Sequence, residues 1–459
     1  MTAPPSTPVA MSWHEASARR LERHGLVEAR RFADSGSATR AICGAHAQIM
    51  AAAEISIAVR MDGATRRDVQ DALWTERTLV KTYGPRGTVH LLPTTDLAMW
   101  SGALGAIPGP ANSFPENVRL TPNQEDAVIA AIDDSLRDVE LVDIQLGAAV
   151  MVRTGAWASD LVMPAFNGMW PRWRQAIPAA AHRGVLCFGP NRGRSVTYTH
   201  PTRWHRRFRP DEPATAVARL VRSHLHAYGP ATPNTFARWL SAPVGWARAS
   251  FAQLQESIQP VSLDGDLAWI DASDTSPDSV EVPEVLLLPY FDPFVVGSHP
   301  RERPYPGRAS ERALARGRAG NYPILLVDGT VAGGSTSPWS LSSTCPHGTA
   351  GYWTIRWIGS RRSRLPSLAS RSARSTLGLT PDRFSIPPAC ISRDTEARPG
   401  GRTSARRRMR KSGVSDEIRR AVCPGSGHSG WKAMRPEPTE PMWEPESRRR
   451  RERRSRGKR

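Results

Sequence analysis

The chain repeats one local order, a group of helices followed by two short strands joined by a tight turn. Apolar residues with helical spacing precede alternating strand-like runs at three places, about a hundred residues apart. The strand pairs are Leu79–Tyr83 with Thr88–Leu92, Val185–Phe188 with Arg194–Thr199, and Ile258–Leu263 with Asp266–Ile270. Helices followed by a hairpin are the order of a winged helix. The sequence therefore predicts an α+β fold built from tandem winged-helix (helix-turn-helix) units.

The turns and helix ends support this prediction. Asp264-Gly265 between two apolar runs is a strong hairpin signal. Ser12 and Glu15 form a capping-box pattern at the start of a helix over 12–24. The small-residue run 37–61 predicts one long helix, and Thr65 is expected to cap the next helix, over 65–77. Further helices are expected over 122–137, 142–154, about 172–183, 213–227, 232–240 and 245–257.

These patterns divide the chain into five parts and a short leader. The expected winged-helix units are 12–95, 96–204 and 205–275, followed by a small β-rich domain, a partial barrel, over 276–333 and a tail over 334–459. The β-rich part also contains a basic stretch, 309–320, that is expected to be helical. Residues 1–10 are expected to form a disordered leader, with Met11 as an alternative start.

The charge of the chain is concentrated in the tail. The formal net charge is +19, but from residue 334 onward 25 Arg and 3 Lys face 10 acidic residues, whereas residues 1–333 carry 34 basic and 33 acidic ones. The bulk charge of the folded part is therefore no evidence for DNA binding. The tail is rich in Arg, Ser and Pro, so it is either disordered or translated out of frame; a basic nucleic-acid-binding arm is the alternative.

Several classes of protein are excluded. The sequence has no run of 18 apolar residues, which excludes a transmembrane helix, and its N-terminus does not resemble a signal peptide. The five cysteines show no CxxC spacing, which favours a reducing cytoplasm and argues against structural zinc. We expect no metal and no cofactor.

Three segments carry a resemblance to a known family. They are GAHAQIMAAAEISIAVRM in 44–61, LVKTYGPRGTVHLLPTTDLAMW in 79–100 and LLLPYFDPFVVGSHPRER in 286–303. Over about residues 12–333 the chain resembles the bacterial AlkZ-like DNA glycosylases, tandem winged-helix proteins with a β-barrel. The resemblance implies excision of N7-alkylated purines and unhooking of crosslinks in double-stranded DNA. We also expect a monomer in the cytoplasm, associated with the nucleoid.

The resemblance points to His46 and Gln48 as the catalytic residues. The family signature is Gln, an apolar residue and Gln, and the matching positions here are His46, Ala47 and Gln48. On a regular helix His46 and Gln48 would be about 200° apart, so they converge only where the helix is irregular. The alternative is a core histidine and a capping glutamine. N7-alkylguanine is already cationic and needs no general acid, so a neutral pair that positions water suffices.

The predicted DNA contacts lie on the hairpins and in the last block. They are Lys81, Arg86, Thr88 and His90 in the first unit, Arg192 and Arg194 in the second, and His299, Arg301 and Arg303. Arginines at hairpin tips suit phosphate contact, although a solvated turn gives the same pattern, and Asp292 before a proline is equally typical of a simple turn. The competing functions are a non-enzymatic winged-helix DNA-binding protein or regulator and, third, a scaffold for another ligand.

Overall fold

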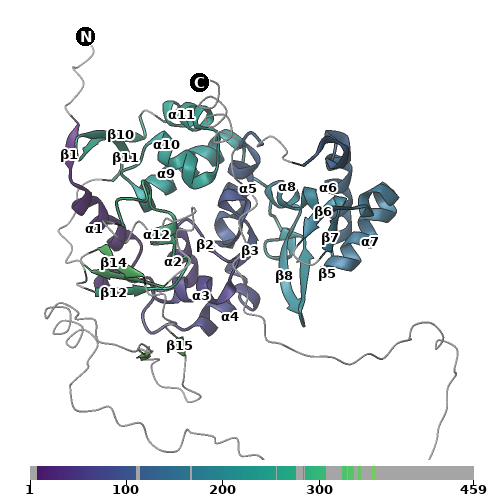
Figure 1. Ribbon diagram of the computed structural model, residues 1–459, viewed down its shortest axis with the longest axis horizontal. Helices are drawn as coiled ribbons and strands as arrows, with labels where there is room; N and C mark the ends of the chain where they lie inside the picture. Colours follow the sequence, from purple (N-terminus) through teal and green to yellow (C-terminus); the bar gives the residue numbers. More distant parts are fainter. Residues whose placement is uncertain are drawn as a thin grey trace, which may run out of the picture. The chain divides into compact units, whose positions relative to one another are not determined.

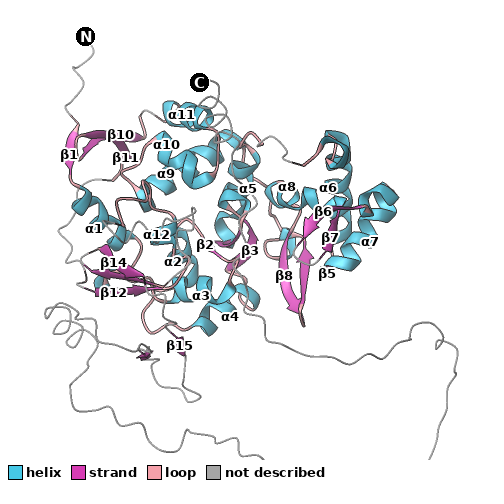
Figure 2. Cartoon of the chain, viewed as in Figure 1, coloured by secondary structure: helices cyan, strands magenta, loops and turns pink. Residues whose placement is uncertain are grey.

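The computed structural model describes residues 8–109, 114–165, 168–254, 256–274, 283, 285–305, 323–327, 329–334, 340–342 and 354–356. All of them lie within one compact unit, residues 1–384. Helices and short strands alternate in it (Figure 2), so the expected α+β class is confirmed. The basic stretch 309–320 and nearly all of the tail lie outside the described residues. Within the described part no helix is long and apolar enough to cross a membrane.

The first helix forms as predicted. Helix α1 spans Trp13–Arg23, with Ser12 and Glu15 in a capping box at its start. It packs against the C-terminal sheet, because Leu21 and the following Leu26 share a core with Leu288 and Phe294. Figure 1 shows α1 beside β12 and β14. The core of the first repeat begins only at Ala38, whereas the predicted unit starts at residue 12.

The first unit contains three helices and a three-stranded sheet. Its elements are α2 Ser35–Ala41, β2 Ala45–His46, α3 Met50–Ala58, α4 Arg66–Trp74, β3 Leu79–Tyr83 and β4 Val89–Pro93. The strands are ordered β2–β4–β3. The prediction of one helix over 37–61 is wrong, because the chain leaves the helix after Ala41 and pairs β2 with β4 before α3 begins.

The second unit repeats this order with additions. Its elements are α5 Leu97–Gly105, α6 Pro122–Leu136, β5 Leu141–Val142, α7 Asp143–Thr154, β6 Leu161–Ala165, β7 Gly168–Pro171, α8 Ile177–His182, β8 Cys187–Arg192 and β9 Ser195–Thr199. The predicted helices and hairpin are confirmed, whereas α5, β5 and the β6–β7 hairpin were not expected. The main sheet has the order β5–β9–β8.

The third unit has the same topology in a reduced form. Its elements are α9 Pro213–Tyr228, α10 Pro233–Leu240, α11 Val244–Ala252, β10 Ile258–Leu263 and β11 Asp266–Asp271. Ala231, between α9 and α10, bridges to Trp269 in the last strand. In all three units, therefore, residues that follow a helix pair with the second strand of the hairpin. A further strand, β1 Val9–Met11, runs parallel to β10, so the prediction of a disordered leader is wrong for these residues.

The described residues of the β-rich part form one small sheet. A sheet β12–β13–β14 is formed by Val285–Leu288, Ile324–Val327 and Thr330–Gly334, with the four-residue helix α12, Pro293–Val296, after its first strand. The predicted hairpin around Gly329 is confirmed. Beyond it, β15 Ser340–Ser342 pairs with β16 Thr354–Arg356.

Candidate active site

In the segment 45–48, Ala45 and His46 form the strand β2, and Gln48 lies at a bend before α3. Ala45 and Ala47 are buried in the core of the first unit, and the amide of Ala47 donates to the carbonyl of Val89 at 2.7 Å. His46 is buried away from that core, and Gln48 is exposed. The segment is therefore not helical, so the separation of about 200° does not apply to it, but Gln48 does not line the pocket that His46 lines.

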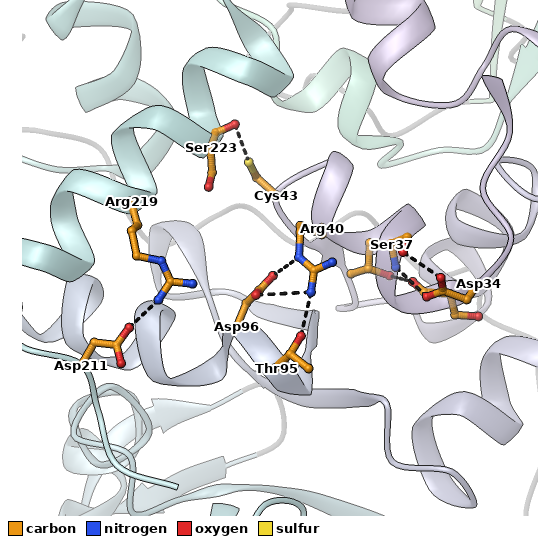
Figure 3. A network of polar contacts seen from close by, with 11 residues as sticks. Asp34, Ser37, Arg40, Cys43, Thr95, Asp96, Asp211, Arg219 and Ser223 are labelled. Carbon is orange, nitrogen blue, oxygen red and sulfur yellow. Dashed lines mark hydrogen bonds and ion pairs between the residues drawn. The ribbon is translucent and has the colours of Figure 1, made fainter. Parts of the chain in front are cut away.

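The turn before this segment explains why the helix ends. Cys43 has φ 53° and Gly44 has φ 91°, both in the left-handed region. A Cβ at Gly44 would lie 2.6 Å from Cδ2 of Leu92, so only glycine fits so close to β4. Figure 3 shows how the end of α2 is fixed: Arg40 donates to Asp96 at 2.7 Å, and the thiol of Cys43 donates to the Ser223 carbonyl in α9 at 3.3 Å.

A pocket opens beside His46. It encloses about 250 Å³ between its walls, including the solvent at its mouth. The walls come from segments distant in sequence, and among the lining residues are His46, Arg86, His90, Tyr228, Trp239 and Phe291. The rings of His46 and Phe291 have centroids 5.0 Å apart. The pocket is partly aromatic and carries a few convergent polar groups, but the space within it that a water-sized molecule can reach is about 10 Å³, so in this conformation it admits a water molecule rather than a base.

Burial determines the protonation states of the two histidines in the pocket, His46 and His90. Burial, together with the nearby charge of Arg86, lowers the pKa of His46 to about 4. His46 is therefore neutral at pH 7, and its buried Nδ1 has no hydrogen-bond partner among the described residues. Burial and Arg86 also lower the pKa of His90. Nδ1 of His90 lies 2.9 Å from the Thr88 carbonyl, to which it must donate, since a carbonyl only accepts.

Arg86 does not occupy an exposed hairpin tip. The short helix Pro85–Gly87 folds the tip against α10, where Nη1 of Arg86 donates to the Trp239 carbonyl at 2.8 Å. Burial lowers the pKa of Arg86 to about 10, which leaves the guanidinium charged at neutral pH. Arg86 is therefore a charged group of the pocket wall.

The other hairpin residues predicted to contact DNA differ in how far they are exposed to solvent. Lys81 lies over the ring of Phe188 at 4.9 Å, between the first and second units. Thr88 is half-buried and His90 is buried, so the two do not form the exposed polar face considered for the strand. Arg192 and Arg194 are exposed at the second hairpin, and Arg192 donates to the Glu140 carbonyl at 2.9 Å.

The predicted residues of the last block separate into two places. His299 is partly buried, and its pKa is lowered to about 3 by burial and by a group of cations that includes Arg301 and Arg86. Arg301 is half-buried beside it. Arg303 instead forms an ion pair of 2.6 Å with Asp264 at the tip of the third hairpin.

Sequence reasoning missed several pocket residues. Tyr228 and Trp239 have ordinary helical spacing, which gives no sign that their rings line a pocket. Sequence reasoning also passed over a cluster of basic residues outside the pocket, the run WHRRFR over 204–209. In it Arg206, Arg207 and Arg209 are exposed and form no ion pair within the described residues. Buried Phe208 anchors this loop, which we call the basic loop (205–209).

Comparison with known proteins identifies the family of this chain. The family model described as DNA glycosylase AlkZ-like matches residues 39–336. The interstrand DNA cross-link repair glycosylase of Streptomyces sahachiroi is 27% identical over 335 residues, which are 70% of this chain and 87% of that protein. The solved structure of Streptomyces sahachiroi DNA glycosylase AlkZ has a TM-score of 0.63 at 24% identity, covering 81% of this chain and 96% of that one, and shows the same fold. The family model spans more than half of the sequence, so this chain belongs to the AlkZ-like family of DNA glycosylases, as its motifs predicted.

Proposed function

We propose that this protein hydrolyses the N-glycosidic bond of N7-alkylated or bulky-adduct purines in double-stranded DNA, in alkylation or crosslink repair. The observation that carries the proposal is the non-helical segment His46-Ala47-Gln48, with His46 in the pocket wall and Gln48 exposed two residues further along the chain. A relative named as an interstrand cross-link repair glycosylase supports the choice of substrate. The enzyme acts as a monomer in the cytoplasm, on the nucleoid.

The neutral state of His46 suits an activated substrate. An N7-alkylated purine leaves as a neutral base, so the reaction needs no proton donor at the leaving group. What remains is an oxocarbenium-like sugar and an attacking water. Neutral His46 accepts a hydrogen bond from that water, and the amide of Gln48 orients it. Without a carboxylate in these two positions, unmodified bases stay intact.

The repeated topology supports tandem winged-helix units in this proposal. Each unit pairs a residue or strand that follows a helix with the last strand of its hairpin. Three such units in one chain replace the symmetry that a dimeric DNA-binding protein uses, which supports a monomer.

The phosphate contacts are assigned to exposed arginines. Arg192 and Arg194 at the second hairpin, together with the basic loop, present charge to solvent. Arg303 is engaged with Asp264, and Arg86 with Trp239, so these two act within the protein. His299 and Arg301 remain candidates for contact with the DNA that enters the pocket.

Base release tests the proposal. A duplex with one N7-methylguanine is incubated with the protein, and the free base is compared with spontaneous release and with an unmodified duplex. Release above the spontaneous rate from the alkylated duplex alone is the expected result. Binding of both duplexes by folded protein without release of the base would instead establish a non-enzymatic DNA-binding protein.

A further inference from the structure

One wall of the pocket comes from the block that follows β12. Phe291, Pro293, Val296 and Gly297 all line the pocket, although they lie more than 240 residues beyond His46 in the sequence. Phe291 makes the closest approach, with its ring centroid 5.0 Å from that of His46 and the two planes tilted by 36°. The ring thus covers one side of the imidazole and keeps water from it.

The backbone of Phe291 is in an unfavourable conformation. Its φ is 60°, in the left-handed region that a large side chain rarely adopts. Such a conformation persists only where the surrounding structure imposes it, and it is concentrated at functional sites. A contact next to Phe291 must therefore hold the chain in place.

That contact is the buried ion pair of Arg60 and Asp292. Both side chains are 0% exposed, and the two guanidinium nitrogens Nη1 and Nη2 donate to separate oxygens of Asp292 at 2.9 and 2.7 Å. Asp292 also caps α12 by accepting from the amide of Phe294 at 2.9 Å. A two-pronged pair of this kind fixes orientation as well as distance.

Arg60 is connected to the catalytic segment by a single helix. Gln48 lies two residues before α3, and Arg60 follows its C-terminal end. The carbonyl of Arg60 is itself held by the amide of Phe32 at 2.9 Å. Helix α3 therefore links the proposed catalytic segment at its start to Arg60 at its end, and Arg60 binds Asp292, the residue after Phe291.

We propose that Arg60 and Asp292 are positioning residues of this glycosylase site: their ion pair holds Phe291 against His46, which shields that side of the imidazole from bulk solvent and keeps the ring in place. The inference rests on the proposed function, because it assigns His46 a part in base release. It agrees with the burial that depresses the pKa of His46. The other charged or titratable groups that line the pocket near His46 are Arg86, His90, Cys43 and Tyr228.

The test removes the ring without disturbing the ion pair. Glycine adopts a φ of 60° without strain, so Phe291→Gly keeps the backbone at Asp292 and loses only the ring. Two quantities are measured on the full chain: the pKa of His46, by NMR of isotope-labelled histidine assigned with His46→Gln, and kcat and KM for release of N7-methylguanine. We expect the pKa to rise by about one unit or more and kcat to fall about tenfold, with a smaller change in KM.

A second pair of variants separates positioning from stability. Arg60→Lys keeps the charge but loses the two-pronged geometry, and should shift the His46 pKa in the same direction. Arg222→Lys is the matched control, because Arg222 forms a similar two-pronged pair with Asp271 in the third unit, at 2.6 and 3.3 Å. It should leave the His46 pKa unchanged.

The outcomes are distinguishable. An unchanged His46 pKa and kcat in folded Phe291→Gly would overturn the inference while the proposed function stands. A wild-type protein that releases no base would overturn the proposed function, and the NMR titration would still decide whether Phe291 and the ion pair position His46.

Discussion

His46 in β2 lies directly opposite His90 in β4, and the two imidazole rings meet edge to face with their centroids 5.4 Å apart. Both are buried, and burial lowers the pKa of each, that of His46 to about 4. The pair is therefore uncharged throughout the neutral range, so neither ring serves as a proton donor to the leaving base.

This pairing predicts a flat pH profile. The rate of N7-methylguanine release, corrected for spontaneous loss, should stay constant from about pH 5 to about pH 8, because His46 protonates only below that range. Single-turnover measurements in buffers of constant ionic strength give the profile. A fall centred near pH 6.5 would show that His46 has an ordinary pKa and would contradict the assignment.

Stability should change with pH in a defined direction. The unfolded chain binds a proton at each histidine near pH 6.5, whereas folded His46 stays neutral down to a pKa of about 4. The unfolding free energy is therefore unaffected above pH 6.5 and decreases as the pH falls from about 6.5 to about 4. His46 alone should account for about 3 kcal/mol of this loss. Urea unfolding of His46→Gln and wild type should be measured across this pH range, and the unfolding free energy of the variant should decrease less steeply as the pH falls. Parallel curves of unfolding free energy against pH would contradict the lowered pKa of His46.

Arg86 should matter more than an exposed hairpin arginine. Arg86→Ala leaves the Trp239 carbonyl without its donor, so the unfolding free energy should fall by about 1–3 kcal/mol. Removing the neighbouring cation should also raise the pKa of His46. Arg192→Ala, at the exposed second hairpin, is the control and should change stability by no more than about 0.5 kcal/mol. Equal effects of the two substitutions would show that Arg86 is an ordinary surface residue.

The basic loop should contribute to the salt dependence of DNA binding. Replacing Arg206, Arg207 and Arg209 by Ala should reduce the slope of log affinity against log salt by about 2–3, if each contacts one phosphate. Fluorescence anisotropy with an unmodified duplex and the full chain measures the slope. The matched control replaces three arginines held in ion pairs of 2.6–2.9 Å, Arg137, Arg183 and Arg219. An identical slope for both triple variants would remove the basic loop from the DNA contacts.

Local signals predicted the repeated elements well. The capping box of α1 and the Asp264-Gly265 hairpin depend on neighbouring residues, and both form as expected. The break after α2 was missed because the alanine-rich run outweighs a single glycine in helix propensity. Pairing of Ala45 and His46 with β4 supplies hydrogen bonds that propensity does not register.

The pocket was predicted only in part, for the same reason. A family motif indicated His46, which lines the pocket, but the rings around His46 come from three distant parts of the chain. The pair of Arg60 and Asp292 joins residues 232 positions apart, and neither has a local pattern that indicates a partner. Burial of Arg86 depends on α10, which no feature of the hairpin sequence reveals.

Substitution of Gln48 tests the central claim most directly. Release of N7-methylguanine from a duplex is compared for wild type, Gln48→Ala and Gln253→Ala, where Gln253 is an exposed glutamine after α11. Circular dichroism and thermal unfolding should be the same for all three, because both side chains are exposed. The account predicts that base release falls at least about a hundredfold in Gln48→Ala and is unchanged in Gln253→Ala. Wild-type rates in Gln48→Ala would contradict it and exclude the 46–48 segment as the catalytic site.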